Sequence, residues 1–454
     1  MTANDTIAAI ATASGDGGIA IIRISGPQAL EIADRVFRCK GLLPSKRPTH
    51  TIIHGHIVAG DQSVDEGLLL IMRAPKSYTC EDVVELHSHG GMVTPKLALR
   101  AVLQAGARMA EPGEFTYRAF INGRMDLVQA ESVNDLIRSR SERAARLALE
   151  QMEGQLSRQF NDIYQNLLSI AADLEATLDF PDDELPPAVL PDIATRINCS
   201  VLKINELLAR WQDGHRLREG LSVVIAGRPN VGKSSLLNAL LGKERAIVSH
   251  QPGTTRDFIE EIYVIDGVPL RIVDTAGLRE TECAIEQEGV RRTHDQIRRA
   301  NFYLYLLDAS APIQDDDLEN IAKLPKDRCI LVLNKIDLGK SIQKQLCEGP
   351  LVVEISIKQN IGIELIKEYI NVLIGRFINL ESLPDAVISE RHYHCLNKAR
   401  HELQNSLDAI KSGNDQLISA HHIRQAIGLI GTITGSDTSE DILSAVFAKF
   451  CIGK

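Results

Sequence analysis

Gly227-Arg-Pro-Asn-Val-Gly232-Lys233-Ser234 is the stretch that decides the fold of this 454-residue chain. It follows an apolar run, residues 221–226, that is typical of a buried strand, and it precedes residues 235–241, which have the pattern of a helix. Together these elements form an anion site, because unpaired backbone N–H groups and the helix dipole converge there. In such a loop Lys233 reaches the terminal phosphates and the Ser234 hydroxyl ligates Mg²⁺. The sequence therefore predicts that the chain binds a nucleoside triphosphate.

The motif Asn334-Lys335-Ile336-Asp337 follows a second buried run, residues 329–333. Its Asp can accept hydrogen bonds from the ring imino and exocyclic amino groups of guanine. Adenine offers neither donor, and a buried carboxylate left without them costs on the order of 1–3 kcal/mol or more. Lys335 can cover the base with its aliphatic stem, and Ser356-Ile357-Lys358 fits the loop that closes over the base. The predicted nucleotide is a guanine nucleotide.

Two further segments complete a magnesium site in the same region. Asp274-Thr275-Ala276-Gly277 follows a short apolar run; its Asp would hold Mg²⁺ through a water, and the Gly277 N–H would meet the γ-phosphate. Thr255, between Gly253 and Asp257, is the expected second hydroxyl ligand beside Ser234. A ring of such hard oxygens suits the octahedral coordination of Mg²⁺. Four elements in this order and spacing resemble the translation-factor-related class of GTPases.

Leu278 stands where Ras-like enzymes have a glutamine that orients the attacking water. Leucine has no polar group, so something else must position the water. Asn230, inside the phosphate loop, suggests a monovalent cation: its amide oxygen can help to coordinate K⁺, and backbone carbonyls of residues 249–254 can complete the shell. The alternative is that Asn230 is only a turn-forming amide, and the residue type leaves both interpretations open.

The composition indicates a globular protein of two or three domains. A net charge of −10 with mixed signs argues against an obviously basic nucleic-acid-binding protein. The eight cysteines include no Cys-x-x-Cys pair, which argues against zinc and against a disulfide framework and favours a reducing cytoplasm. Residues 1–20 contain no Lys or Arg, so no signal peptide is expected, and no apolar run reaches the roughly 18 residues of a membrane span.

Changes in pattern divide the chain into segments. A long proline-free stretch, residues 122–178, has apolar residues at helical spacing and predicts a long helix, and an acidic, proline-bearing break follows at 179–187. Within the GTPase segment, residues 258–273 predict one antiparallel hairpin in an otherwise parallel sheet. The predicted protein is multidomain, with an α/β Ras-like P-loop GTPase domain inserted in an all-α helical domain. The expected limits are 1–120 for an N-terminal α+β domain, 121–218 and 381–454 for the two parts of the helical domain, and 219–380 for the GTPase domain.

The whole chain resembles the MnmE/TrmE family of bacterial tRNA-modification GTPases. The resemblance is carried by the phosphate loop, by Gly253-Thr-Thr-Arg-Asp257 and Asp274-Thr-Ala-Gly-Leu-Arg279, and most specifically by the terminal Cys451-Ile-Gly-Lys454. In the N-terminal domain it is carried by Asp5-Thr-Ile7, Arg23-Ile-Ser-Gly26, Glu81-Asp-Val-Val-Glu85, His89-Gly-Gly91 and Glu111-Pro-Gly-Glu-Phe115.

This resemblance implies a homodimer formed through N-terminal domains that bind a folate one-carbon donor, 5-formyl- or methylene-tetrahydrofolate. It also implies a heterotetramer with an FAD-dependent partner of the MnmG type. The complex would hydrolyse GTP in a K⁺-stimulated, Mg²⁺-dependent reaction, and it would modify carbon 5 of the wobble uridine in certain tRNAs.

The resemblance also implies roles for individual residues. It places folate contacts at Arg23, Glu81, Arg124 and Lys454, and a potassium shell at Asn230, Ser249, Gln251 and Thr254. It makes Glu286 the general base, which the residues alone do not distinguish from Glu280 or Glu282, and it implicates Cys451 in modification. The predicted GTP-binding residues are Asn230, Val231, Gly232, Lys233, Ser234, Ser235, Ser249, Thr254, Thr255, Asp274, Thr275, Ala276, Gly277, Asn334, Lys335, Asp337, Ser356, Ile357 and Lys358.

Three interpretations stay open. The thiol of Cys451, after a final helix expected to dock, could be inert or reactive. A ribosome-assembly or signalling GTPase, or a nucleotide-gated scaffold, would share the nucleotide motifs but would not need a folate-like domain or a terminal cysteine. Several basic residues fit either tRNA phosphates or ordinary solvated helix faces, so most tRNA affinity is expected from the FAD-containing partner. These residues are Arg138, Arg140, Arg143, Arg146, Arg391, Lys398 and Arg400.

Overall fold

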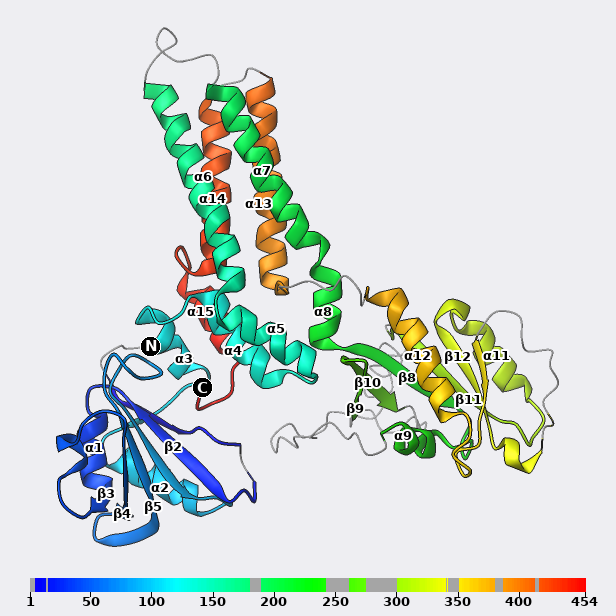
Figure 1. The fold of residues 1–454 in the computed structure, drawn as a ribbon, viewed down its shortest axis with the longest axis horizontal. Helices are drawn as coiled ribbons and strands as arrows, with labels where there is room; N and C mark the ends of the chain where they lie inside the picture. The colour runs from blue at the N-terminus through cyan, green and yellow to red at the C-terminus, as the bar shows by residue number, and fades with distance from the viewer. Residues whose placement is uncertain are drawn as a thin grey trace, which may run out of the picture. The chain divides into compact units, whose positions relative to one another are not determined.

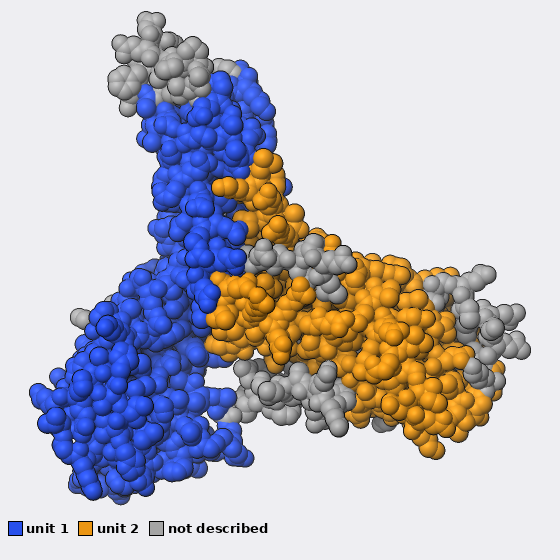
Figure 2. Space-filling model, in the orientation of Figure 1, with its two compact units in different colours: residues 1–134, 151–201, 395–454 blue, residues 135–150, 202–394 orange. Residues whose placement is uncertain are grey.

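The computed structural model describes residues 5–13, 15–179, 189–241, 261–274, 300–339, 341, 351–379, 387–412 and 416–454. They belong to two compact units (Figure 2). Unit 1 comprises residues 1–134, 151–201 and 395–454, and unit 2 comprises residues 135–150 and 202–394. Among the described helices, none combines the length and the apolar character that a membrane crossing requires.

The N-terminal part of unit 1 is a seven-stranded sheet with helices packed on it (Figure 1). The strand order is β3-β4-β5-β6-β2-β1-β7, and all neighbours are antiparallel except β1 and β7. Alternate residues of the central strands share one apolar core with α1 and α2, because successive strand residues point to opposite faces. The predicted α+β domain is confirmed. Its elements are β1 Ile7–Ile10, β2 Ile19–Ser25, α1 Ala29–Val36, β3 Phe37–Cys39, β4 Thr51–Ala59, β5 Gln62–Met72, β6 Val83–His89, α2 Thr94–Gln104 and β7 Arg108–Met109.

Helices make up the rest of unit 1. Helices α6 and α14 lie side by side (Figure 1), although they come from opposite sides of the GTPase segment in sequence. The predicted insertion of one domain into a helical one is therefore confirmed. The helices of this region, some of which lead into unit 2, are α3 Glu114–Ile121, α4 Leu127–Arg138, α5 Glu142–Met152, α6 Gln155–Asp179, α7 Val189–Ala209, α13 Glu390–Lys411, α14 Gln416–Thr434 and α15 Glu440–Phe447.

The prediction of one long helix over residues 122–178 is wrong, because α4, α5 and α6 share this stretch. The Ser141 hydroxyl caps the start of α5 by accepting a hydrogen bond from the Ala144 N–H at 3.2 Å. Gly154, between α5 and α6, has φ +85°, a left-handed conformation that interrupts a helix. A serine cap and a glycine thus break the helix without proline, and the arginines of this stretch are divided between α4, α5 and the residues that join them.

Unit 2 contains a six-stranded sheet of order β13-β12-β11-β8-β10-β9. All neighbours are parallel except the hairpin of β9 and β10, which confirms the predicted hairpin within residues 261–274. Asp266 and Gly267, at its turn, both have positive φ, as a two-residue turn between twisted strands requires. The elements are α8 Trp211–Glu219, β8 Leu221–Gly227, α9 Lys233–Leu241, β9 Glu261–Ile265, β10 Val268–Asp274, β11 Phe302–Asp308, α11 Asp315–Lys323, β12 Cys329–Asn334, β13 Leu351–Glu354 and α12 Ile363–Phe377.

Candidate functional sites

The loop between β8 and α9 has the backbone of a phosphate-binding loop. Gly227, Asn230 and Gly232 all have positive φ, and α9 begins at Lys233. A Cβ at Gly227 would lie 2.4 Å from the Leu306 carbonyl oxygen, and one at Gly232 would lie 2.4 Å from Asn334 Nδ2. Both positions therefore require glycine, and the loop presents its backbone N–H groups at a helix N-terminus, where anions bind.

Predicted phosphate and magnesium ligands lie on the first turn of α9. The Lys233 ammonium donates hydrogen bonds to the carbonyl oxygens of Gly227 and Arg228, both at 2.8 Å, so it lies across the loop. Ser234 and Ser235 are exposed, whereas Val231 is buried. The exposed Ser234 hydroxyl at this helix N-terminus fits a hard cation that also binds phosphate oxygens.

Asn334 joins the phosphate loop to the predicted base loop. Its side chain is only 3 % exposed, at the carboxyl end of β12. Its Nδ2 donates to the Val231 carbonyl oxygen at 2.8 Å, and its Oδ1 accepts from the Ile357 N–H at 3.3 Å. The residue predicted to sit beside the base therefore also braces the loop predicted to hold the phosphates.

Asp337 and Lys335 are held by neighbours in the same edge of the sheet. Ser356, which is buried, donates its hydroxyl to Asp337 Oδ1 at 2.6 Å. Lys335 donates to Asp308 Oδ2 at 2.6 Å. Burial alone would raise the pKa of Asp308, but the hydrogen bonds from Lys335 and Ser310 outweigh it and hold that pKa below its usual value. Asp308 was not predicted, although its place at the carboxyl end of a parallel strand is where ligands bind in such sheets.

Other predicted residues of this site lie outside the described part of the chain. Asp274 is the last residue of β10, and its backbone pairs with Ile225 of β8. Lys358 is exposed in the loop after β13. The residues outside the described ranges are Ser249, Gln251, Thr254, Thr255, Thr275, Ala276, Gly277, Leu278 and Glu286, together with Glu280 and Glu282.

A second polar site lies in the N-terminal domain around Arg23. Arg23 Nε donates to Glu85 Oε1 at 2.8 Å, and these two residues are direct partners across β2 and β6. The Arg23 guanidinium lies 5.3 Å from the ring centroid of Tyr78 and 5.7 Å from that of Phe115. Arg124, also a predicted folate contact, lies 4.9 Å from the same Tyr78 ring. Arg23 and Arg124, two of the predicted folate contacts, therefore both lie against the ring of Tyr78.

The C-terminal tail packs onto this site. Arg23 Nη1 donates to the Gly453 carbonyl oxygen at 3.4 Å, and the Gly113 N–H donates to the Cys451 carbonyl oxygen at 3.4 Å. A Cβ at Gly453, which has φ +98°, would lie 2.4 Å from the Ile10 carbonyl oxygen. Burial and the charge of Arg23 lower the pKa of Lys454, although Glu85 and Cys451 act in the opposite direction. The structure thus brings the tail beside Arg23.

Helix α15 anchors this tail, as its apolar face predicted. Phe447 and Phe450 are buried, and Phe447 contacts the Tyr117 ring edge-on with centroids 5.4 Å apart.

Sequence reasoning missed Tyr78, Glu85 and Phe115 as members of the site around Arg23. Only the Arg23–Glu85 cross-strand pairing, which depends on strand register, would have indicated Glu85.

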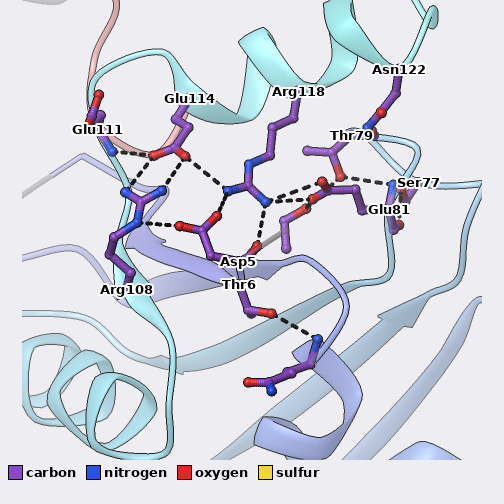
Figure 3. A network of polar contacts seen from close by, with 12 residues as sticks. Asp5, Thr6, Ser77, Thr79, Glu81, Arg108, Glu111, Glu114, Arg118 and Asn122 are labelled. Atoms are coloured by element: carbon purple, nitrogen blue, oxygen red, sulfur yellow. Dashed lines mark hydrogen bonds and ion pairs between the residues drawn. The ribbon is translucent and has the colours of Figure 1, made fainter. Parts of the chain in front are cut away.

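Glu81, the fourth predicted folate contact, belongs to a partly buried network of ion pairs (Figure 3). Arg118 donates to Glu81, Asp5 and Glu114, and Arg108 donates to Asp5 and Glu114. Burial alone would raise the pKa values of Asp5 and Glu114, but their hydrogen bonds to the two arginines hold both pKa values below their usual range. Both carboxylates are therefore ionised at neutral pH.

The basic residues considered for tRNA are distributed over three helices, α4, α5 and α13, and the segment between α4 and α5. Arg146 pairs with Glu150 at 3.1 Å within α5, and Arg400 donates to Asn397 at 2.7 Å within α13. Arg391 Nη2 lies 3.1 Å from His392 Nε2. These contacts within single helices favour ordinary solvated helix faces.

Known proteins match the whole chain. The model of the TrmE N-terminus matches residues 6–124, and that of the MnmE helical domain matches residues 127–451. Proteins named tRNA modification GTPase MnmE include one from Geobacter metallireducens, 46 % identical with 100 % of both chains covered. Another, from Desulforamulus reducens, is 42 % identical over 99 % of this chain and 100 % of its own length. Among solved structures, the G domain of the T. maritima FeoB iron transporter is 28 % identical, covers 34 % of this chain and 98 % of its own, and has a TM-score of 0.27. The phosphate loop, the sheet edge that carries Asn334 and Asp337, and the docked tail therefore lie in a chain that belongs to the MnmE family.

Proposed function

We propose that this protein is a GTP hydrolase that acts in tRNA modification. The observation that carries the proposal is the arrangement at the sheet edge: Asn334 braces the phosphate loop, and Ser356 orients Asp337 to accept hydrogen bonds from a base. A carboxylate held in this way selects guanine, because adenine lacks the two matching donors. The relatives that match the full length of the chain are named as tRNA-modification GTPases, which supports the tRNA substrate.

In the proposed hydrolysis, backbone N–H groups of the loop and Lys233 bind the phosphates. Ser234 and Thr255 would hold Mg²⁺, with Asp274 acting through a water, and the ion would neutralise charge on the β- and γ-phosphate oxygens. Glu286 would accept the proton of the water that attacks the γ-phosphorus, since Leu278 offers no polar group. The further phosphate and base contacts would come from the remaining predicted residues: Val231, Gly232, Ser235, Thr275, Ala276, Gly277, Lys335, Ile357 and Lys358.

K⁺ is the proposed second cation of the phosphate site. Asn230 sits exposed in the loop with φ +64°, a conformation in which a short polar side chain is tolerated. Together with Ser249, Gln251 and Thr254 it would supply neutral oxygen ligands. The ion would place positive charge where other GTPases use an arginine finger.

The second half of the proposal concerns folate. Arg23, Arg124 and Lys454 would bind the carboxylates of a tetrahydrofolate, and Glu81 would accept hydrogen bonds from the N–H groups of its ring. The guanidinium carbons of Arg23 and Arg124 lie 5.3 and 4.9 Å from the Tyr78 ring centroid, which supports a site for flat, polarizable groups. Bound there, 5-formyl- or methylene-tetrahydrofolate supplies the one-carbon unit, and Cys451 would lie beside it.

The proposed assembly is a homodimer that forms a heterotetramer with an FAD-dependent protein of the MnmG type, in the cytoplasm. The complex would modify carbon 5 of the wobble uridine. A ribosome-assembly or signalling GTPase is the alternative. It is disfavoured because it needs neither the cationic–aromatic site around Arg23 nor a C-terminal cysteine docked beside it.

One experiment decides between these functions: the modified-nucleoside profile of tRNA from cells that lack this protein. The proposal predicts loss of a C5-substituted wobble uridine and its recovery when the gene is restored. An unchanged profile together with defective ribosomal subunits would support the alternative. Co-purification of a reduced folate with the wild-type protein is the independent check on the N-terminal site.

A further inference from the structure

Arg118 ties the carboxylate of Glu81 to the interior of the N-terminal domain (Figure 3). It lies on α3 with a side chain only 5 % exposed. Its Nη1 donates to both Glu81 oxygens, at 3.3 and 3.2 Å, and to the Asp5 carbonyl oxygen at 2.8 Å. Its Nη2 donates to Glu114 Oε1 at 3.1 Å and to Asp5 Oδ1 at 2.5 Å. One planar guanidinium therefore fixes three carboxylates.

Ser25 holds the same carboxylate from a second direction. Its hydroxyl donates to Glu81 Oε2 at 2.7 Å. That hydroxyl has a single proton, so Thr79 must be the donor in the 2.6 Å contact between the Ser25 and Thr79 hydroxyls. The Glu81 main chain is also held, because the Ser77 hydroxyl donates to its carbonyl oxygen at 2.6 Å. The rotamer of Glu81 is thus set by partners on its inner side.

The outer side of Glu81 faces the surface. Its side chain is 17 % exposed, compared with 30 % for Asp5 and 1 % for Glu114. Among the ion pairs of the described residues, Arg118 is the one that joins Glu81 to this network. Three carboxylates share two guanidinium groups, so the cluster keeps one net negative charge. Asp5 and Glu114 are each bound by both guanidinium groups, whereas Glu81 is bound by Arg118 and not by Arg108, so Glu81 is the least neutralised carboxylate of the cluster and is the one placed to offer charge to a ligand.

We propose that Arg118 is a positioning residue for the folate site, acting through Glu81 without touching the ligand. The inference rests on the proposed folate function. It adds that the buried guanidinium group of Arg118 pre-organises Glu81, the acceptor for the ring N–H groups. The affinity of the site for folate therefore depends on a residue that does not contact the ligand. A lysine would keep the charge but could not bind three carboxylates with a rigid fork.

The test is isothermal titration of the full-length protein with 5-formyltetrahydrofolate. We expect Arg118→Lys to weaken binding about ten-fold, the scale typical of losing a group that orients a ligand-binding residue. Ser25→Ala should weaken it by about three- to ten-fold. Arg108→Lys is the matched control, because Arg108 belongs to the same network and binds Asp5 and Glu114 but not Glu81. It should change the affinity less than three-fold while lowering the melting temperature.

A double-mutant cycle separates positioning from general stability. In a Glu81→Gln background, Arg118→Lys should change the affinity less than two-fold, because its effect passes through the missing carboxylate. If the losses multiply in full, or if Arg118→Lys and Arg108→Lys weaken binding equally, the proposal is overturned. If Arg118→Lys does not fold, the same cycle with Ser25→Ala decides. A wild-type protein that does not bind the probe refutes the folate site itself, whereas binding that Arg118→Lys and Ser25→Ala leave unchanged refutes only the role of the supporting network.

Discussion

Asn334→Ala tests whether Asn334, which lies beside the predicted base-binding loop, supports the phosphate loop. The substitution removes two hydrogen bonds, the 2.8 Å bond from Nδ2 to the Val231 carbonyl and the 3.3 Å bond from the Ile357 N–H to Oδ1. Asn334 is 3 % exposed, so the two backbone groups are left poorly solvated. This single substitution therefore removes the Asn334 hydrogen bond from the phosphate loop and from the predicted base-binding loop, residues 356–358.

The expected loss follows from these two bonds. Each contributes about 1–1.5 kcal/mol net, the usual contribution of an intramolecular hydrogen bond in a folded protein. The sum is about 2–3 kcal/mol of nucleotide affinity, or a dissociation constant raised about 30- to 150-fold. Since Asp337 and its Ser356 partner are untouched, the preference for the guanine amino group should persist.

The assay is competition of GTP and inosine triphosphate against a fluorescent guanine nucleotide. Affinities for both should fall by the same factor, because the loop is damaged and not the base selection. Asn320→Ala, an exposed asparagine on α11, is the control and should match the wild type. Affinities within three-fold of wild type, or a loss confined to GTP, would refute the bracing role.

Four other outcomes are expected. Hydrolysis should be faster in K⁺ than in Na⁺ at equal ionic strength, and Asn230→Ala should abolish the difference; equal wild-type rates would exclude the cation. Glu286→Ala should keep GTP affinity and lower turnover roughly 10²-fold, with Glu280→Ala as the unaffected control; the reverse pattern would show that the base is misassigned. Cys451→Ser should abolish tRNA modification but leave GTP hydrolysis and melting temperature near wild type, and full modification would demote the thiol to packing. The folded-state pKa of Glu114 is below its unfolded value of 4.5, so its stabilisation is complete above that pH and is lost as the pH falls through the folded value. Thermal melts between pH 6 and 3 should therefore decline less steeply for Glu114→Gln, and parallel curves would contradict this.

The phosphate loop of the candidate nucleotide site was predictable because its parts are local in sequence. Strand, glycine turn and helix follow one another within residues 221–241, and the parallel sheet brings the ends of β8, β12 and β13 to one edge. Local sequence patterns did not reveal which hydrogen bonds connect these strand ends. The Asn334 bond to Val231 spans 103 positions, and the Asp308 partner of Lys335 lies on another strand.

The helix prediction over residues 122–178 failed for a related reason. Apolar spacing and the absence of proline describe each of α4, α5 and α6, but they do not locate the ends. The ends depend on a serine cap and a left-handed glycine, both weak signals in a periodic stretch.

By itself the sequence determined the GTPase motifs, the insertion of that domain and the likeness to one family, since each depends on residues close together or on an overall pattern. Only the tertiary structure decided how the N-terminal site is built. Arg23 and the Gly453 carbonyl are 430 positions apart, and Arg118 and Asp5 are 113 apart. Strand register and the docking of α15 bring these groups together, because a buried charge is stable only beside partners that the folded chain supplies. No local sequence pattern indicates which distant carboxylate will pair with a given arginine.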